Sequence, residues 1–288
     1  MDNFQVLGPE QFPSRLREIP DRPKQLYIDG TLPPDDFVYL AVVGSRKHTP
    51  YGKDACEMLI KGLAGLPVVI VSGLAIGMDS IAHRTALACG LPTIAIPGSG
   101  LSDAVLYPRS NLGLARQIRE AGGCLISEYE PDFKATLWSF PRRNRIMAGM
   151  SHAVLIIEAE QKSGSLITAR LAADYNCDVL AVPGSIFSPQ STGPNFFIGL
   201  GATPISTVND LRIALGFEAS STGKIFDANT LSPAQKSLFD LLDTPSPFET
   251  LVEQSKKSIP ELVGIISELE VLGAIKETPD GYVQNLNS

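Results

Sequence analysis

The sequence predicts an α/β protein built on a doubly wound, mostly parallel sheet, followed by a small winged-helix domain. Three observations support this prediction. Short apolar runs typical of buried strands alternate with helical segments of ten or more residues between 38 and 215. Segments rich in glycine and serine follow several of these runs. A stretch without periodicity, at 216–230, then separates this part from three further helices and a hairpin.

The composition is that of a well-buried globular chain. Its 288 residues are 44% hydrophobic and 19% charged, enough for one large domain and a small appendage. No apolar run approaches the roughly 20 residues of a membrane helix, and the acidic N-terminus lacks a signal-peptide core. The four cysteines (Cys56, Cys89, Cys124 and Cys177) lie in or beside apolar segments without metal-ligand spacing. We therefore expect a cytoplasmic protein without membrane contact.

Along the chain, residues 1–36 are rich in proline and are expected to form an irregular strap packed on the main domain at 37–215. The expected strands are Val38 to Gly44, Val68 to Gly73, Thr93 to Pro97, Cys124 to Ser127, Ala153 to Ile157 and Val179 to Val182. The expected helices are Pro50 to Leu63, Met78 to Ala88, Asn111 to Ala121 and one that begins at Ser165. Because helical crossovers join parallel strands, the carboxyl ends of these strands should meet at one edge of the sheet.

An arginine-rich segment lies inside this pattern. Phe140 to Arg145 is expected to form a turn that opens a short apolar helix, Ile146 to Met150. The helix dipole disfavours cations there, so their concentration favours a bound anion over a merely solvated turn, and arginine suits phosphate oxygens. We expect these arginines to lie on an exposed rim. The predicted binding residues are Gly44, Ser45, Arg46, Phe140, Arg142, Arg143, Asn144, Arg145, Lys162, Ser163, Gly164 and Ser165.

Motifs for catalysis and cofactors are weak. No segment matches the GxxxxGK[ST] phosphate loop, and no GxGxxG precedes an acidic residue by about twenty positions. Glu158 and Glu160 follow a strand, but no nucleophile or matched acid stands beside them. Asp79 and His83 are four apart on one helix face without a third metal ligand, which favours structural packing. We therefore expect no enzyme activity, no cofactor and no metal.

A second unit is expected at 231–288, after a linker at 216–230. Helices at Ser232 to Leu242, Phe248 to Gln254 and Ile259 to Leu272, followed by a hairpin from Ala274 to Val283, have the order of a winged helix-turn-helix. Four lysines and no arginine against nine acidic residues disfavour duplex DNA as its ligand and favour an interaction or regulatory role. The net charge of the whole chain, −7, still allows a local basic pocket elsewhere.

Six segments together resemble the DNA-processing protein A (DprA/Smf) family. They are VGSRKHTPYG at 43–52, SGLAIGMDSIAHRTAL at 72–87, IPGSGLSDAVLYPRSN at 96–111, FPRRNRIMAGMS at 140–151, SGSLITARLA at 163–172 and AVPGSIFSPQSTGPNFFIGLGA at 181–202. The resemblance implies an extended Rossmann-like domain that binds single-stranded DNA in a basic pocket, dimerises, and delivers the strand to the RecA recombinase during natural transformation. The pocket maps here onto Gly44 to Arg46 and the Arg142-to-Arg145 segment, with Lys162 nearby.

We therefore predict a non-enzymatic mediator that binds single strands without reading their sequence. Phe140 is expected either to stack a base or to pack in the core, and Phe196, Phe197 and Ile198 are a candidate dimer contact. Two alternatives stay open. One is a Rossmann-like enzyme that binds or hydrolyses nucleotides, although the PGGxGT loop of such enzymes is replaced by KSGSLIT at 162–168. The other is a transcription regulator that acts through the winged helix.

Overall fold

The computed structural model describes residues 4–218, 231–255, 257–271, 274–278 and 281–284. The chain forms two compact units, Met1–Glu218 and Ala219–Ser288, and each is described by itself. From residue 219 onward, the linker predicted at 216–230 lies outside the described residues. The domain boundaries taken from the sequence stay a prediction.

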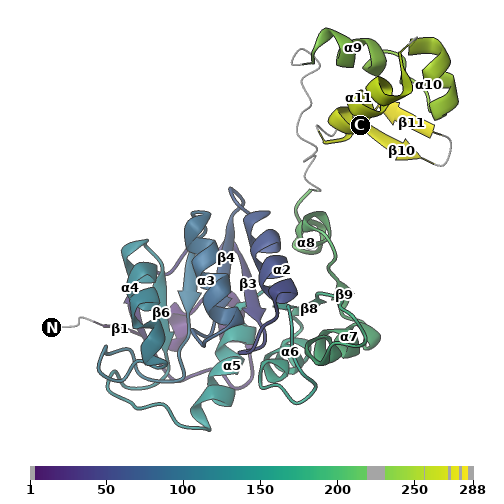
Figure 1. Cartoon of the computed structure of the whole chain (residues 1–288). Helices are drawn as coiled ribbons and strands as arrows, with labels where there is room; N and C mark the ends of the chain where they lie inside the picture. Colours follow the sequence, from purple (N-terminus) through teal and green to yellow (C-terminus); the bar gives the residue numbers. More distant parts are fainter. Residues whose placement is uncertain (1–3, 219–230, 256, 272–273, 279–280, 285–288) are drawn as a thin grey trace. The chain divides into compact units, whose positions relative to one another are not determined.

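The first unit is organised around a nine-stranded sheet with the order β1-β2-β6-β5-β4-β3-β7-β8-β9 (Figure 1). All strand pairs from β6 to β9 are parallel. The chain moves outward from β3 through β4, β5 and β6, then crosses back to β7 on the other side of β3. The strands are β1 (Gln5–Leu7), β2 (Leu26–Gly30), β3 (Val38–Val43), β4 (Val68–Ser72), β5 (Thr93–Ala95), β6 (Cys124–Ser127), β7 (Ala153–Ile156), β8 (Asp178–Ala181) and β9 (Thr203–Pro204). The reversal between β3 and β7 is the position at which doubly wound sheets bind ligands.

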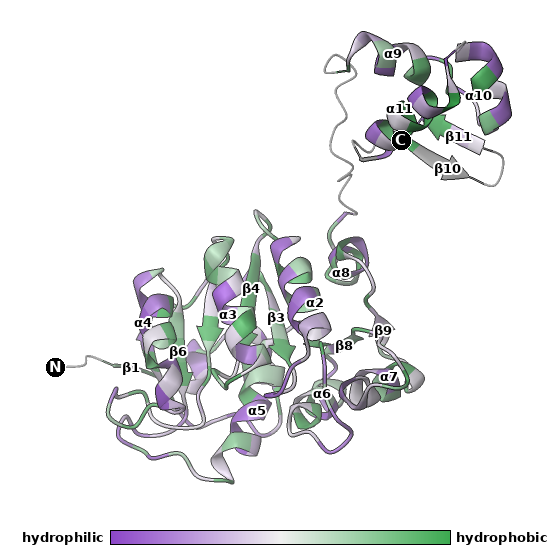
Figure 2. Cartoon of the chain, viewed as in Figure 1, coloured by the Kyte–Doolittle hydropathy of each residue, from purple (hydrophilic) through white to green (hydrophobic). Residues whose placement is uncertain are grey.

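Helices cover both faces of this sheet, so its central strands are apolar on both sides (Figure 2). Tyr39, Ala41 and Val43 of β3 face a core shared with α1, α5, α6 and α7. Leu40 and Val42 face the opposite core, shared with α2, α3 and α8. The helices are α1 (Ser14–Glu18), α2 (Pro50–Lys61), α3 (Met78–Ala88), α4 (Leu112–Glu120), α5 (Ser139–Met150), α6 (Ser165–Asp174), α7 (Thr192–Gly199) and α8 (Val208–Ala214), with short 3₁₀ turns η1 (Pro9–Gln11), η2 (Arg109–Asn111) and η3 (Pro189–Ser191). The predicted alternation of strands and helices is confirmed.

The N-terminal segment differs from the irregular strap predicted for 1–36. Its residues Leu26 to Gly30 form β2, which pairs antiparallel with β6, and β1 pairs antiparallel with β2. Tyr27 lies opposite Ser127 in this pairing. These strands are difficult to predict because each is short, prolines flank them, β2 depends on the edge of β6 for its hydrogen bonds, and β1 depends on β2.

The arginine-rich segment is also more helical than predicted. Helix α5 begins at Ser139, so the arginines lie in its first two turns and not in a turn that precedes it. Pro141 is tolerated because the first turn of a helix has no intrahelical partner for its N–H groups. Ser139 Oγ donates to Gly98 O at 2.6 Å, which fixes the start of the helix against the loop after β5.

The second unit has the predicted order of elements and its own apolar core, which includes Leu238, Leu251, Leu262 and Leu269. Helices α9 (Pro233–Phe239), α10 (Phe248–Ser255) and α11 (Ile259–Val271) precede the antiparallel strands β10 (Ile275–Thr278) and β11 (Gly281–Gln284). Within the described ranges, no helix is long and apolar enough to cross a bilayer.

Candidate functional site

A cavity of about 480 Å³ opens at the carboxyl ends of β3 and β7, where the strand order reverses. We call it the Arg46 cavity. It brings together ten of the twelve predicted binding residues: Gly44, Ser45, Arg46, Phe140, Arg143, Asn144, Lys162, Ser163, Gly164 and Ser165. These residues come from the β3–α2 loop, the start of α5 and the β7–α6 loop, which are far apart in the sequence. The expectation that these strand ends meet at one edge of the sheet is therefore confirmed, and the binding role of the residues stays a prediction.

The rim of the Arg46 cavity carries three exposed cations, Arg46, Lys47 and Lys162, and one exposed carboxylate, Glu160. None of them has an ion pair with any residue that the structure describes. The Arg46 guanidinium lies 5.7 Å from the centre of the Phe140 ring. Lys47 was not predicted, although it directly follows Arg46 in the sequence. Exposed cations without a carboxylate partner can pair with anions from solution.

Phe140 lies half-buried at the edge of this cavity. Its ring is seated on Gly98, where an added Cβ would be 2.5 Å from Phe140 Cδ1. The Tyr107 ring is 5.6 Å away, centre to centre. The ring thus packs against the loop after β5 and also borders the cavity, so both predicted roles, core packing and base stacking, remain compatible with its position.

The start of α6 supplies backbone groups to the same cavity. Ser163 Oγ accepts from Ser165 N at 3.3 Å and lies 2.6 Å from Ser165 Oγ, which holds the turn in shape. Asn144 Nδ2 donates to Gly164 O at 3.3 Å and so ties α5 to this turn. A helix N-terminus of this kind carries a partial positive charge. Together with Lys162 it favours an anion at this edge.

The floor of the cavity consists of Asp79 and Arg143, both buried. Arg143 Nη1 donates to Gly73 O at 2.6 Å and to Ile96 O, and Nε donates to Asn144 Oδ1 at 3.1 Å. Burial lowers the pKa of Arg143 to about 10, with the charge of Asp79 opposing the shift. The prediction that Arg143 lies on an exposed rim is wrong. Arg143 is on the inner face of α5, which directs its side chain toward Gly73 O and Ile96 O, just after β4 and β5.

The Asp79 carboxylate is held by the loop between β4 and α3. Its Oδ2 accepts from Gly73 N at 3.1 Å and from Ala75 N at 3.2 Å. Burial raises its pKa, while the Arg143 charge opposes that rise. The floor therefore holds one acidic side chain, Asp79, and one basic side chain, Arg143. The net positive charge of the site comes from its rim.

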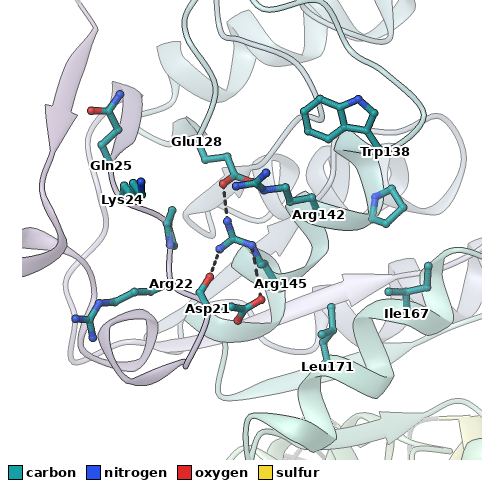
Figure 3. Close-up of a pocket in the computed structure, with 12 residues that line it drawn as sticks. Asp21, Arg22, Lys24, Gln25, Glu128, Trp138, Arg142, Arg145, Ile167 and Leu171 are labelled. Carbon is teal, nitrogen blue, oxygen red and sulfur yellow. Dashed lines mark hydrogen bonds and ion pairs between the residues drawn. The ribbon is translucent and has the colours of Figure 1, made fainter.

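Arg142 and Arg145 do not line this cavity. They are three residues apart and so share a helix face, which borders a second cavity of about 960 Å³ (Figure 3). Arg145 is buried and ion-paired, with Nη2 2.5 Å from Glu128 Oε2 and Nη1 2.6 Å from Asp21 O. Arg142 is exposed, with Nε 3.4 Å from Glu128 Oε1. The prediction of one arginine cluster at one site is therefore wrong, and so is the exposed-rim prediction for Arg145.

The other chemical candidates have structural partners. Glu158 is buried and accepts from Thr49 N at 2.9 Å and Thr49 Oγ1 at 2.6 Å. Glu160 instead accepts from Gln190 at 2.9 Å, so the two carboxylates do not act on one point. His83 Nδ1 lies 2.7 Å from Thr93 Oγ1. Over the described part of the chain, no three His, Cys, Asp or Glu residues group as a metal site.

Comparison with known proteins gives consistent matches. The sequence profile of the DNA recombination-mediator protein A family matches residues 3–216. The chain is 36% identical over 283 residues to Protein Smf of Escherichia coli (strain K12), covering 96% of this chain and 75% of that protein. It is 41% identical over 215 residues to DNA processing protein DprA of Streptococcus pneumoniae, covering 75% of this chain and 74% of that protein.

Two solved structures resemble the first unit. The X-ray structure of DprA from Streptococcus pneumoniae has a TM-score of 0.68 and 38% identity, covering 73% of this chain and 74% of that chain. A structure of DNA processing protein A from Helicobacter pylori, described for its single-stranded DNA binding mode, has a TM-score of 0.66 and 34% identity. It covers 74% of this chain and 97% of that chain. The predicted family resemblance and fold class are thus confirmed.

Proposed function

Because the chain belongs to the DNA recombination-mediator protein A family, we propose that it binds single-stranded DNA in the Arg46 cavity and acts as a recombination mediator without enzymatic activity. The cations of the rim and the N-terminus of α6 neutralise phosphates. Such contacts position a strand without reading its bases, so binding depends little on sequence.

One observation carries this proposal: three unpaired cations and a helix N-terminus converge on one cavity at the reversal of the strand order. The chain as a whole has a net charge of −7, so this concentration of positive charge is local. A local basic pocket is what an acidic protein needs to attract a polyanion.

The proposal includes delivery of the strand to the RecA recombinase during natural transformation. It rests on the family, and its test is whether the protein speeds RecA assembly on single-stranded DNA. The proposal also includes a cytoplasmic location, which the four free cysteines support.

We also propose that two copies of the chain form a homodimer. Of the three predicted contact residues, Phe196 is exposed, Phe197 lies in the core and Ile198 is partly buried against it. Leu200, which directly follows α7, is also exposed. Two of these apolar side chains are thus available to a second copy. Light scattering should give a dimer at tens of micromolar, and a monomer throughout that range would contradict this part.

The rival enzyme gains little support from the described residues. Both oxygens of Glu158 are engaged by Thr49, so this carboxylate is not available as an acid or base. Glu160 lines the Arg46 cavity and accepts from Gln190 with Oε1, and it is not joined there by a second free carboxylate among the described lining residues. Release of base or phosphate from free nucleotides would nevertheless restore the enzyme hypothesis.

The test is a fluorescence-anisotropy titration of oligothymidylate and of a duplex of equal length at several salt concentrations. We expect tighter binding to the single strand and a slope of log K against log salt of about −2 to −3, from three or four neutralised phosphates. Equal or tighter binding to the duplex would contradict the proposal and favour a regulator acting through the second unit.

A further inference from the structure

The second cavity, which we call the Trp138 cavity, has walls from four separate segments (Figure 3). The N-terminal segment contributes residues 21–25, the loop after β6 contributes Glu128 and Trp138, and α5 and α6 complete the wall. Pro141 and Ile167 border both this cavity and the Arg46 cavity. The two cavities therefore adjoin across the first turn of α5.

The charged side chains of the Trp138 cavity form two groups: one is held in ion pairs within the protein, and the other, which we call the available set, is exposed to solvent. Arg145 is buried between Glu128 and Asp21, as the dashed lines in Figure 3 show. Tyr175 also donates to Asp21 Oδ1 at 2.5 Å. Asp21 thus joins α5 and the end of α6 to the N-terminal segment, and Glu128 Oε2 holds Arg145 from the loop after β6.

The available set consists of the cations Arg22, Lys24 and Arg142, all exposed. Lys24 has no ion pair with any described residue, and Arg22 only donates to Arg17 O at 2.9 Å. Arg142 shares Glu128 with Arg145. The cavity therefore presents uncompensated positive charge, as the rim of the Arg46 cavity does.

Trp138 gives this cavity an aromatic surface. The residue is 54% exposed, although its ring packs edge-on against Tyr129 and Phe133 at 5.8 and 5.7 Å between ring centres. These contacts hold the indole in place. A fixed, exposed aromatic ring among cations is the combination with which proteins bind single strands, because bases stack on the ring while cations pair with phosphates.

The wall also contains an acceptor without a hydrogen bond. Glu128 Oε1 is buried and has no hydrogen-bond donor in the described part of the chain, with only the 3.4 Å ion pair to Arg142 Nε beside it. Buried acceptors are normally satisfied. This carboxylate therefore has one acceptor site to spare, next to the Arg142 guanidinium.

We propose that the Trp138 cavity is a second subsite for the strand held in the Arg46 cavity. The strand crosses the border formed by Pro141 and Ile167, its phosphates pair with Arg22, Lys24 and Arg142, and a base stacks on Trp138. This inference rests on the proposed function. It adds that the bound strand is longer than one cavity and crosses the first turn of α5.

The test measures the affinity for oligothymidylates of about 2 to 16 nucleotides in the parent and in the variant Lys24→Ala/Arg142→Ala. Both proteins should bind the shortest oligomers equally. On the longest, the variant should be at least about tenfold weaker, and its salt slope shallower by about 1.4, from two lost phosphate contacts. The control Lys134→Ala/Arg170→Ala removes two exposed cations outside both cavities and should match the parent.

A positive signature comes from photo-crosslinking with 5-iododeoxyuridine placed at successive positions of the longest oligomer. Trp138 should crosslink to a narrow range of positions. Parent-like affinity of the variant at every length, or no crosslink to Trp138 at any position, would overturn the inference and leave the cavity to another anionic partner, such as an acidic peptide.

The two proposals fail in different ways. If Arg46→Glu abolishes binding of every oligomer while Lys24→Ala/Arg142→Ala changes nothing, the Arg46 cavity binds DNA and the second subsite is wrong. If Arg46→Glu leaves the shortest oligomers bound as in the parent, the proposed function itself is wrong.

Discussion

The floor and the rim of the Arg46 cavity each contain an arginine, and the two guanidinium groups do different things. Arg143 on the floor is buried and donates to two backbone carbonyls, so its charge is already used by the protein. Arg46 and Lys162 on the rim are exposed and have no carboxylate partner among the described residues. An arginine at a ligand-binding edge is therefore available to a ligand only where the fold leaves its guanidinium exposed.

The largest effect on stability is expected from the floor. Arg143→Ala removes the side-chain donor to Gly73 O and Ile96 O and the stronger of two positive charges that act on Asp79, the other being Arg46. We expect the free energy of unfolding of the first unit to fall by about 4 kcal/mol. Trp138 is the only tryptophan, so urea titration followed by its fluorescence reports on this unit. A loss below about 1 kcal/mol would mean that Arg143 is not a structural brace.

The next largest effect should separate two neighbours on α5. Arg145→Ala leaves the buried Glu128 carboxylate without its 2.5 Å partner, which should cost about 3 kcal/mol. Arg142→Ala removes an exposed partner of the same carboxylate and should cost less than about 1 kcal/mol. The same urea titration measures both. Equal losses would show that burial does not distinguish these two arginines.

A smaller effect should appear in the pH dependence. Burial, together with the nearby Arg143 charge, lowers the pKa of His83 from 6.5 to about 3. Between these two values the unfolded chain binds a proton that the folded chain does not, so the His83 contribution reduces stability as pH falls. The slope should be about 1.4 kcal/mol per pH unit.

The matched variant for this experiment is His83→Asn, which keeps a donor for Thr93. Thr93 Oγ1 donates to Ile70 O at 2.8 Å and therefore accepts from His83 Nδ1. The difference in stability between parent and variant should shrink steadily from pH 6.5 to pH 4. A difference that stays constant over this range would show that His83 titrates normally.

The smallest effect is expected from removal of the second unit. The sequence from residue 231 to residue 288 contains no arginine and has more acidic than basic side chains. Deleting residues from 219 onward should therefore change the affinity for single-stranded DNA less than tenfold, or about 1.4 kcal/mol. Anisotropy titration of the full and shortened chains measures this. A larger loss would show that the rim of the Arg46 cavity is not sufficient.

The sequence predicted the central strands because they are buried on both faces and therefore apolar along their whole length, as β3 and β7 are. It also predicted that Gly44, Arg46 and Lys162 would meet, since the carboxyl ends of parallel strands share one edge. It could not predict which way the side chains of Arg142, Arg143 and Arg145 point from the helix. Each residue of a helix is turned about 100° from the last, so a start at Ser139 instead of after Arg145 changes which side chains face the core.

The N-terminal segment was not predicted as strands because its pairing depends on a distant part of the chain. Strands β1 and β2 have three and five residues; β2 pairs with β6, about one hundred positions later, and β1 pairs only with β2 among the described strands. Local periodicity over so few residues cannot distinguish an edge strand from a proline-rich loop.

The most direct test of the account is charge reversal on the rim, with Arg46→Glu/Lys162→Glu compared against Arg84→Glu/Arg170→Glu. Both variants change the net charge equally, but Arg84 and Arg170 are exposed outside both cavities. We expect the rim variant to bind single-stranded DNA at least about 100-fold more weakly than the parent, with an unchanged unfolding midpoint and an unaffected control. A folded rim variant that binds as tightly as the parent would contradict the assignment of the Arg46 cavity as the DNA-binding site.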